Sequence, residues 1–291
     1  MANRGVLYVV VGSNDIYAKA VVRSAISLRR VMPDLPIAIA SDRMIDGPFD
    51  RHISIEETDG FRAKIVGMMQ TPFEQTVFLD ADTFVLADIG DVFELLDRYD
   101  MALVHEPSRV SLVLDDVPAS FPEFNSGVIA YRSTPLVQSA LADWLREYGE
   151  IRPRPKTQDQ PSLRRVLYRT TELRIATLTS EFNRRIDTAG YFHGQIRVLH
   201  GWPRTDITFE RIAAAMSAGS PDSPRAYAGG RVFDHKGRQI GDFLPPWHRI
   251  RSVARRILPR RARSVAGRTL PRGVRSMVRR ALPRRTRRGA G

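Results

Sequence analysis

The sequence contains no cysteine among its 291 residues, which excludes disulfide bonds and thiolate metal ligands. It also has no apolar run long enough to cross a bilayer as a helix. The first residues lack the layout of a signal peptide, because the apolar run 6–11 is short and no small-residue cleavage site follows it. These absences lead us to expect a cytoplasmic protein.

Acidic residues and lysine are missing from the C-terminal part of the chain. From Arg249 to the end there are 16 arginines and no Lys, Asp or Glu. Subtracting them from the 45 basic residues of the whole chain leaves 29 against 32 acidic ones, a balance of −3 for residues 1–248. The sequence therefore predicts two parts, a globular domain over residues 1–245 and a basic tail over residues 246–291.

Apolar runs and helical periodicity alternate along the first part. The continuous apolar run 6–11 predicts a strand buried on both faces, and residues 16–31 have the apolar spacing of a helix that Pro33 ends. Further strands are predicted at 36–40, 51–55 and 76–79, and a helix at 61–69. This order is typical of an α/β fold with a mainly parallel sheet. The segment 106–123 is long and poorly periodic, which is typical of a functional lid or of a disordered loop.

The stretch Thr76-Val-Phe-Leu-Asp-Ala-Asp-Thr-Phe84 carries the strongest chemical signal. A buried strand is followed by Asp80 and Asp82, and in an extended segment side chains two residues apart point the same way. Two converging carboxylates repel each other unless a cation lies between them. We therefore expect a divalent metal site at the carboxyl end of this strand, where open α/β sheets bind ligands. The alternative is that both aspartates only stabilise the turn that follows.

Several short motifs follow one another between residues 5 and 204. They are Val10–Asp15, Lys64, Leu79–Thr83, Phe124–Gly127, Asp159–Gln160, Phe182–Asn183 and Leu199–Gly201. In order and content this series resembles the GT-A type of nucleotide-sugar glycosyltransferase, close to glycosyltransferase family 8. The resemblance implies a single Rossmann-like GT-A domain with a central, mainly parallel mixed sheet. It also implies transfer of a hexose from a nucleotide diphosphate, with UDP as the expected nucleotide.

By this resemblance the metal ligands are Asp80, Asp82 and His200, with Ala81 between the two aspartates also facing the donor. Mixed carboxylate and imidazole ligation favours Mn²⁺, with Mg²⁺ as the alternative. A lone histidine at a strand end is often structural, and His193 is the competing imidazole.

The resemblance and strand positions also predict residues that bind the nucleotide and its phosphates: Gly12, Asn14, Asp42, Lys64 and Arg204. Gly12 follows the first strand, where backbone approaches a ligand closely. Asn14 and Asp42 end the first two strands and are candidates for uracil and ribose contacts, with ordinary turn chemistry as the alternative. For Lys64 the alternative is a surface lysine. The family's lysine after the histidine is absent, and Arg204 in Gly201-Trp-Pro-Arg204 is its candidate replacement.

The catalytic and sugar-binding candidates are Asn125, Asp159, Gln160 and, again, Lys64. The resemblance implies that Asp159 and Gln160 lie beside the anomeric carbon, whereas the alternative is a helix N-terminus at which Asp is favoured. The stereochemical outcome stays open. Retaining relatives have no strong protein nucleophile, and an inverting enzyme would need a base such as Asp159 or Glu123.

The tail contains a repeat with a period of 12 residues over 251–286. In each repeat the apolar residues fall on one helical face and arginines on the other, and Pro259, Pro271 and Pro283 end the segments. We expect the tail, residues 249–291, to bind an anionic membrane surface, which uses both faces. This would place the protein on the inner face of the membrane, near a glycan or lipid-linked acceptor. Nucleic acid is the rival partner, although the tail has no aromatic residue for base stacking.

Three other functions compete with glycosyl transfer. A sugar nucleotidyltransferase would carry a Gly-rich, Arg-containing loop after the first strand, and Val11–Asn14 lacks that pattern. A non-catalytic nucleotide-sugar-binding protein or membrane scaffold would bind donor without turnover. A nucleic-acid-binding protein would act through its Arg-rich tail.

Overall fold

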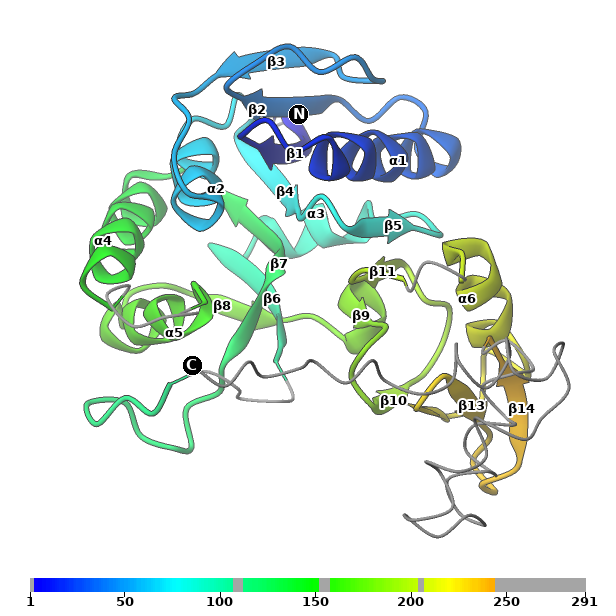
Figure 1. Cartoon of the computed structure of the whole chain (residues 1–291). Helices are drawn as coiled ribbons and strands as arrows, with labels where there is room; N and C mark the ends of the chain where they lie inside the picture. Colours follow the sequence, from blue (N-terminus) through cyan, green and yellow to red (C-terminus); the bar gives the residue numbers. More distant parts are fainter. Residues whose placement is uncertain (1–2, 107–111, 152–157, 204–206, 244–291) are drawn as a thin grey trace, which may run out of the picture.

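The computed structural model describes residues 3–106, 112–151, 158–203 and 207–243 (Figure 1). Arg204 and residues 244–291, which include the predicted tail, therefore lie outside the described residues. Within the described residues, no helix has both the length and the apolar content needed to span a membrane.

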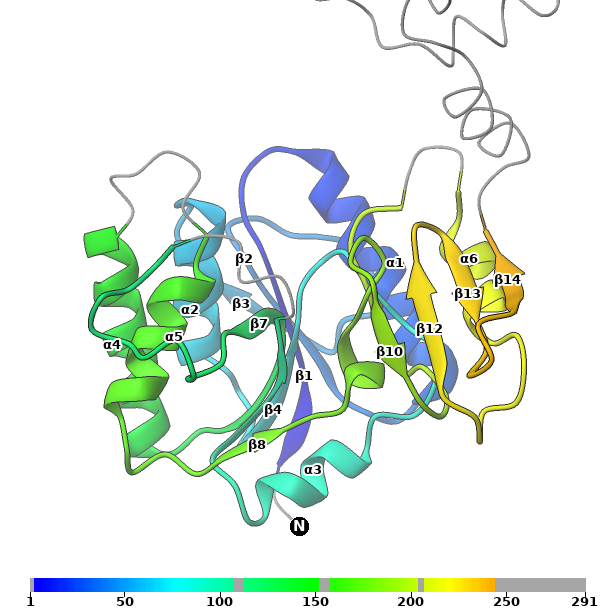
Figure 2. The ribbon, with the colours of Figure 1, turned by 90° about the horizontal axis from the view of Figure 1, so that it is seen from below.

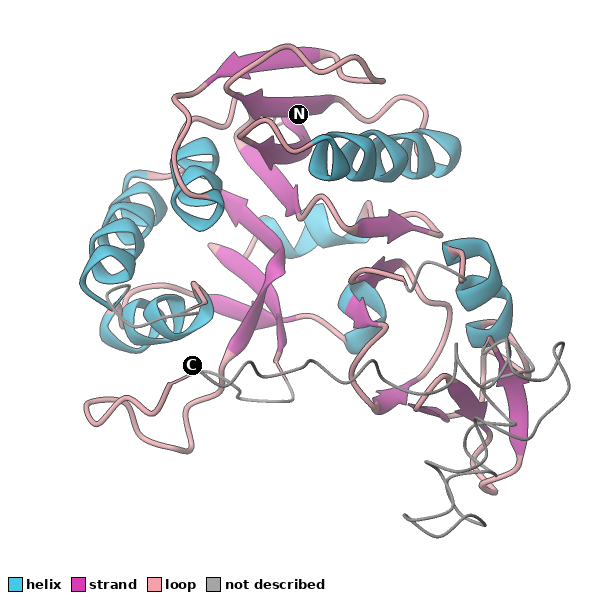
Figure 3. Cartoon of the chain, viewed as in Figure 1, coloured by secondary structure: helices cyan, strands magenta, loops and turns pink. Residues whose placement is uncertain are grey.

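A seven-stranded sheet forms the centre of the molecule (Figure 3). Its strands, in spatial order, are β3 (Arg51–Ser54), β2 (Ile37–Ser41), β1 (Arg4–Val10), β4 (Gln75–Leu79), β7 (Phe124–Arg132), β6 (Met101–His105) and β8 (Ile175–Thr177). β7 runs antiparallel to both of its neighbours, and the other pairings in the sheet are parallel. The predicted α/β class and mainly parallel mixed sheet are confirmed.

Helices cover both faces of this sheet (Figure 1). They are α1 (Asp15–Val31) and α3 (Asp91–Leu96) on one face, and α2 (Gly60–Met69), α4 (Pro135–Ile151) and α5 (Gln160–Arg169) on the other. An apolar core lies on each face of the sheet, and alternate residues of β1 pack into one or the other. Val6 and Tyr8 pack in the core on the α1 face, whereas Leu7 packs in the core on the α2 face. A strand buried on both faces must be apolar throughout, which explains the continuous run in the sequence.

Two smaller sheets extend the molecule beside α1 (Figure 2). The first consists of β5 (Thr83–Val85), β11 (Val198–His200) and β9 (Arg184–Arg185), which follows the 3₁₀ helix η1 (Ser180–Asn183). The second consists of β10 (Gly190–Phe192), β12 (Arg225–Ala228), β13 (Arg231–Phe233) and β14 (Gln239–Asp242), and α6 (Phe209–Met216) packs on it. A third apolar core joins the two sheets, with Phe84 stacked on Phe209 at 5.0 Å between ring centroids.

Two local features lie at the beginning of β7 and in the loop before it. The motif Phe124–Gly127 is the beginning of β7 itself, because Phe124 pairs with His105 of β6. The described part of the loop before it, residues 112–123, is fastened to α5: Arg164 donates to the carbonyl oxygens of Pro118 and Phe121 at 2.7 and 2.8 Å. This part of the loop is therefore held by the helix rather than left as a free lid.

Candidate active site

Asp80 and Asp82 lie in the tight turn that connects β4 to β5. The amide of Asp80 donates to the carbonyl oxygen of Gly127 on β7 at 2.8 Å, and Thr83 closes the turn by donating from its amide to Asp80 O at 3.1 Å. The amide of Gly201 donates to Asp82 O at 3.1 Å. The two carboxylates are thus brought together by a turn held from two sides, and not by strand alternation alone.

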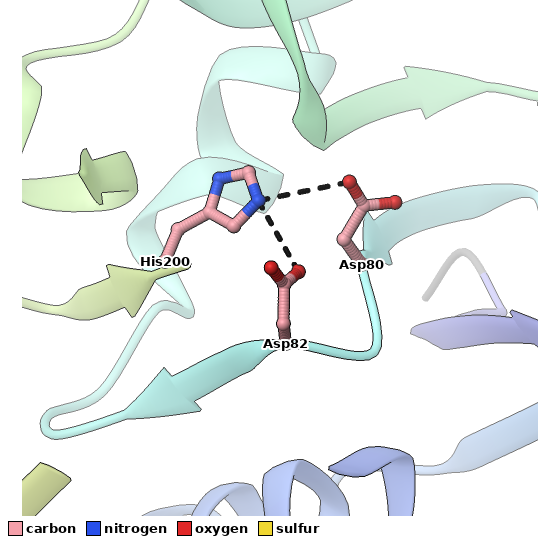
Figure 4. Close-up of side chains that lie close together, drawn as sticks. All are labelled: Asp80, Asp82 and His200. Atoms are coloured by element: carbon pink, nitrogen blue, oxygen red, sulfur yellow. Dashed lines mark ion pairs between the residues drawn. The ribbon is translucent and has the colours of Figure 1, made fainter. Parts of the chain in front are cut away.

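His200 reaches this turn because β11 pairs antiparallel with β5, with His200 opposite Thr83. Its Nε2 lies 3.3 Å from Asp82 Oδ1 and 3.7 Å from Asp80 Oδ2 (Figure 4). One ligand atom from each of the three side chains lies within 4.8 Å of the other two. The competing His193 is exposed and faces the carbonyl oxygen of Asp222 at 3.2 Å, so it is not part of this group.

Asn183 determines which nitrogen of His200 faces the carboxylates. The side chain of Asn183 donates from Nδ2 to Asn125 Oδ1 at 2.8 Å, and its own Oδ1 lies 2.8 Å from His200 Nδ1. An amide oxygen only accepts, so Nδ1 carries a proton and Nε2 is the nitrogen that faces Asp80 and Asp82. In a neutral ring this is the tautomer in which Nε2 can ligate a metal.

Gly127 leaves the space that the imidazole occupies. A Cβ placed on Gly127 would overlap the His200 ring, at 2.7 Å from both Nδ1 and Nε2. Any side chain at this position of β7 would displace the imidazole, so the glycine of the Asn-Ser-Gly motif is required for the His200 position.

Lys64 is buried between Asp80 and Asp159, beside the start of α5. Its Nζ lies 3.0 Å from Asp159 Oδ2, 3.2 Å from Asp80 Oδ1 and 3.1 Å from Ser126 Oγ. Burial alone would lower the pKa of Lys64, but the charges of Asp159 and Asp80 outweigh it and raise the pKa, so the ammonium stays protonated. Burial raises the pKa of Asp80, against the opposing effects of Lys64 and His200. The positive charges of the protein therefore offset the negative charge of Asp80 only in part.

Asn125 and Gln160 belong to a buried polar network. Asn125 Nδ2 donates to Gln160 Oε1 at 3.1 Å and to Glu106 Oε2 at 2.8 Å, and Gln160 Nε2 donates to Glu123 Oε1 at 3.1 Å. Asp159 Oδ1 accepts from Ser126 Oγ at 3.0 Å, in addition to its contact with Lys64. The motifs at 124–127 and 159–160, far apart in sequence, are therefore one hydrogen-bonded unit.

A cavity of about 870 Å³ opens over these groups. The predicted residues that line it are Lys64, Asp80, Ala81, Asp82, Asn125, Asp159, Gln160 and His200. The structure also brings in residues that the sequence did not single out as site residues: Tyr17, Phe61, Tyr148 and Trp202. These aromatic residues carry no local sequence signal, since they come from four separate segments.

Three predicted residues stand apart from this lining. The amide of Gly12, which has φ +84°, donates to Asp42 Oδ2 at 2.9 Å, and Asn14 Oδ1 caps α1 by accepting from the amide of Ile16 at 3.0 Å. The adjacent Val11 does line the cavity, so this loop borders it.

The sequence matches no protein-family model and no curated protein. Among solved structures, the apo form of the glycosyltransferase GlyE from Streptococcus pneumoniae TIGR4 is similar, with a TM-score of 0.51 and 15% identity over 70% of this chain and 55% of that one. The fold is that of the GT-A glycosyltransferases.

Two further similar structures are mouse xyloside xylosyltransferase 1 and an active-site mutant of LgtC. The first has a TM-score of 0.46 and 15% identity, covering 68% of this chain and 97% of that one. The second has a TM-score of 0.45 and 12% identity, covering 69% and 88%. The present chain spans about half the length of the GlyE chains, 46% and 55% in two structures.

Proposed function

We propose that this protein is a metal-dependent glycosyltransferase that transfers a sugar from a nucleotide diphosphate, with UDP as the expected nucleotide, to a glycan or lipid-linked acceptor. The observation that carries the proposal is the convergence of Asp80, Asp82 and Nε2 of His200 beside a cavity in a GT-A fold. A cavity of about 870 Å³ has room for a nucleotide sugar.

The donor set fits a divalent cation. Two carboxylates and a neutral imidazole held by an amide are a typical set for Mn²⁺, with Mg²⁺ as the alternative. When bound, such an ion would supply positive charge to a departing diphosphate. The raised pKa of Asp80 agrees with a buried carboxylate whose negative charge is only partly offset by Lys64 and His200.

The remaining residues divide by position. The ammonium of Lys64, held between Asp80 and Asp159, adds fixed positive charge at the floor of the cavity. Asp159, Gln160 and Asn125 would orient the transferred sugar from the wall formed by β7 and α5. We assign the nucleotide and its phosphates to Gly12 and Asn14 between β1 and α1 and to Asp42 after β2, together with Arg204, which is outside the described residues.

The tail, also outside the described residues, supports a membrane location. Its 16 arginines and periodic apolar positions would bind an anionic lipid surface. This places the acceptor at the inner face of the membrane.

The test is metal-dependent hydrolysis of a panel of nucleotide sugars. The wild type should release nucleotide diphosphate with at least one donor when Mn²⁺ is present and lose this activity in chelator. Asp82→Asn should lower the rate at least about a hundredfold, since a Lewis acid contributes several kcal/mol. The control Asp143→Asn changes an aspartate on the outer face of α4 that pairs with Arg146 at 2.6 Å, and should keep the wild-type rate. Equal rates with and without metal would contradict the proposal, as would binding of donor without turnover.

A further inference from the structure

Two exposed aromatic side chains line the cavity, and an exposed isoleucine precedes one of them in the sequence. Ile16 is 59% exposed, Tyr17 46% and Trp202 45%. The rings of Tyr17 and Trp202 meet edge to face, with 5.6 Å between their centroids, and both side chains line the cavity. We call Ile16, Tyr17 and Trp202 the apolar rim.

The packing of α1 does not account for the apolar rim. This helix buries Val21, Ala25 and Leu28 against the sheet, one or more turns further along. Trp202 comes from the segment after β11, so two distant parts of the chain place large apolar groups at the same exposed site. Exposed aromatic groups gathered at one point mark a contact surface more often than scattered single residues do.

The segment between β2 and β3 contacts the beginning of α1. Its Arg43 donates to the carbonyl oxygen of Gly12, and the Arg43 guanidinium lies 3.9 Å from the carboxylate of Asp15. The next residue, Met44, is 75% exposed. The acidic charge beside the apolar rim is thus offset by an arginine, and a further exposed apolar side chain follows directly.

The rest of the chain indicates what covers this surface. The described chain ends at Phe243, just after β14, and Figure 2 shows the end of β14 and the start of α1 on the same side of the molecule. The 43 residues from 249 to 291 then carry 16 arginines and no acid, with apolar positions between them. A bilayer with anionic headgroups fits both features, because tyrosine and tryptophan favour the interface and arginine favours the headgroups.

We propose that the apolar rim inserts into the interfacial region of an anionic lipid bilayer, so that the mouth of the cavity faces the membrane. This inference rests on the membrane role proposed for the tail, but not on glycosyl transfer. It goes beyond tethering, since it specifies which face of the folded domain meets the lipid. A lipid-linked acceptor could then enter the cavity without leaving the bilayer surface.

The test uses the full chain and its few tryptophans. The sequence has three: Trp144 is fully buried, Trp202 is in the apolar rim, and Trp247 is in the tail. In Trp247→Phe, vesicles of phosphatidylglycerol and phosphatidylcholine with brominated acyl chains should quench Trp202 emission relative to unbrominated vesicles. The matched control Trp247→Phe/Trp202→Phe, which keeps only Trp144, should show no quenching while still binding the vesicles.

A second measurement compares two isoleucines of α1 by vesicle co-sedimentation. Ile16→Ser should weaken binding about tenfold, as expected for loss of one buried aliphatic side chain. Ile26→Ser, at a position 41% exposed in the middle of the same helix, should bind like the wild type. Donor hydrolysis without vesicles reports separately on the proposed enzyme and should be unchanged in Ile16→Ser.

The outcomes separate the proposals. Vesicle binding with unquenched Trp202, or equal binding by both isoleucine variants, would overturn the insertion of the apolar rim and leave the tail as the sole anchor. Failure to bind vesicles would overturn both membrane proposals. A Trp202 emission change that depends on protein concentration or on soluble glycan, and not on lipid, would assign the rim to a second copy or to the acceptor instead.

Discussion

Two groups of charged side chains differ in how their charges balance. The site cluster (Lys64, Asp80, Asp82, Asp159 and His200) sets three carboxylates against one ammonium and one imidazole. The helix cluster (Asp116, Glu147, Arg165 and Arg169) sets two carboxylates against two guanidiniums, with all four contacts between 2.8 and 3.1 Å.

This difference separates a structural role from a binding role. In the helix cluster every charge has a partner in the protein, and the pairs join the 112–123 loop to α4 and α5. In the site cluster negative charge is in excess and partly buried, an arrangement that costs free energy unless a cation is supplied from outside. The excess itself, more than the presence of two aspartates, indicates a ligand.

Adding a cation should therefore affect the two clusters differently. At a Mn²⁺ concentration a hundredfold above Kd, binding should stabilise the wild type by about 2.7 kcal/mol. This corresponds to a rise of about 5–10 °C in the thermal midpoint. The double variant Asp80→Asn/Asp82→Asn should show no such rise in the same thermal scan. An equal rise in both proteins would place the ion elsewhere.

The next largest effect is expected at Gly127. Gly127→Ala forces the His200 ring away from the carboxylates, and should weaken Mn²⁺ binding by more than about a hundredfold, since one of three ligands is lost. Titration calorimetry with Mn²⁺ measures the change. The control is Gly149→Ala in α4, where a new Cβ meets only the flexible end of Arg62, 3.3 Å away. Unchanged affinity in Gly127→Ala would show that His200 is not a ligand.

A smaller loss is expected when the imidazole is no longer oriented. Asn183→Leu removes the acceptor for His200 Nδ1, and should weaken Mn²⁺ binding about 10- to 100-fold. Gln75→Leu removes a comparable buried amide that pairs with Asp97 at 2.9 Å, and should leave the affinity alone. If both variants lose affinity equally, the effect is one of general stability.

In the helix cluster a substitution should change stability but not metal binding. Glu147 is buried and accepts from Arg165 at 3.1 Å and from Arg169 at 2.8 Å. Glu147→Gln should cost about 1–2 kcal/mol of unfolding free energy, a reduced value because Arg169 is half exposed. Urea unfolding with and without Mn²⁺ should give the same loss of unfolding free energy relative to the wild type. If Mn²⁺ restored the stability of Glu147→Gln, the helix cluster would not be independent of metal binding.

The smallest effect is expected on how the unfolding free energy changes in acidic buffer. Burial would raise the pKa of Asp116, but the hydrogen bond and charge of Arg165 outweigh it and lower the pKa below its ordinary value. The stabilising contribution is therefore present above the unfolded-state pKa and is lost as the pH falls through the lowered folded-state pKa. Asp116→Asn should narrow the difference in unfolding free energy between neutral and acidic buffer. If Asp116→Asn kept the wild-type dependence of unfolding free energy on pH, the pairing of Asp116 with Arg165 would contribute nothing to stability.

Local sequence patterns account for much of the central sheet. Apolar runs correspond to β1, β2 and β4, and α1 ends at Val31, two residues before Pro33. The helix N-terminus given as the alternative for Asp159 and Gln160 is present, since α5 begins at Gln160. Elements beyond residue 184 were mostly not predicted, because β9, β10 and β13 are two or three residues long. Strands this short have no periodicity of their own and form only where a partner strand and the third apolar core hold them.

The sequence by itself singled out Asp80, Asp82 and His200 as candidate metal ligands and predicted the β4 strand that ends just before the two aspartates. It could not decide between His200 and His193, nor show that Lys64 is buried. Those outcomes depend on contacts across long stretches of chain: the pairing of β11 with β5, the space left by Gly127, and the approach of Asp159 to Lys64. The physical reason is that composition and spacing record only the chemistry of each segment, whereas burial and charge balance depend on which segments pack together.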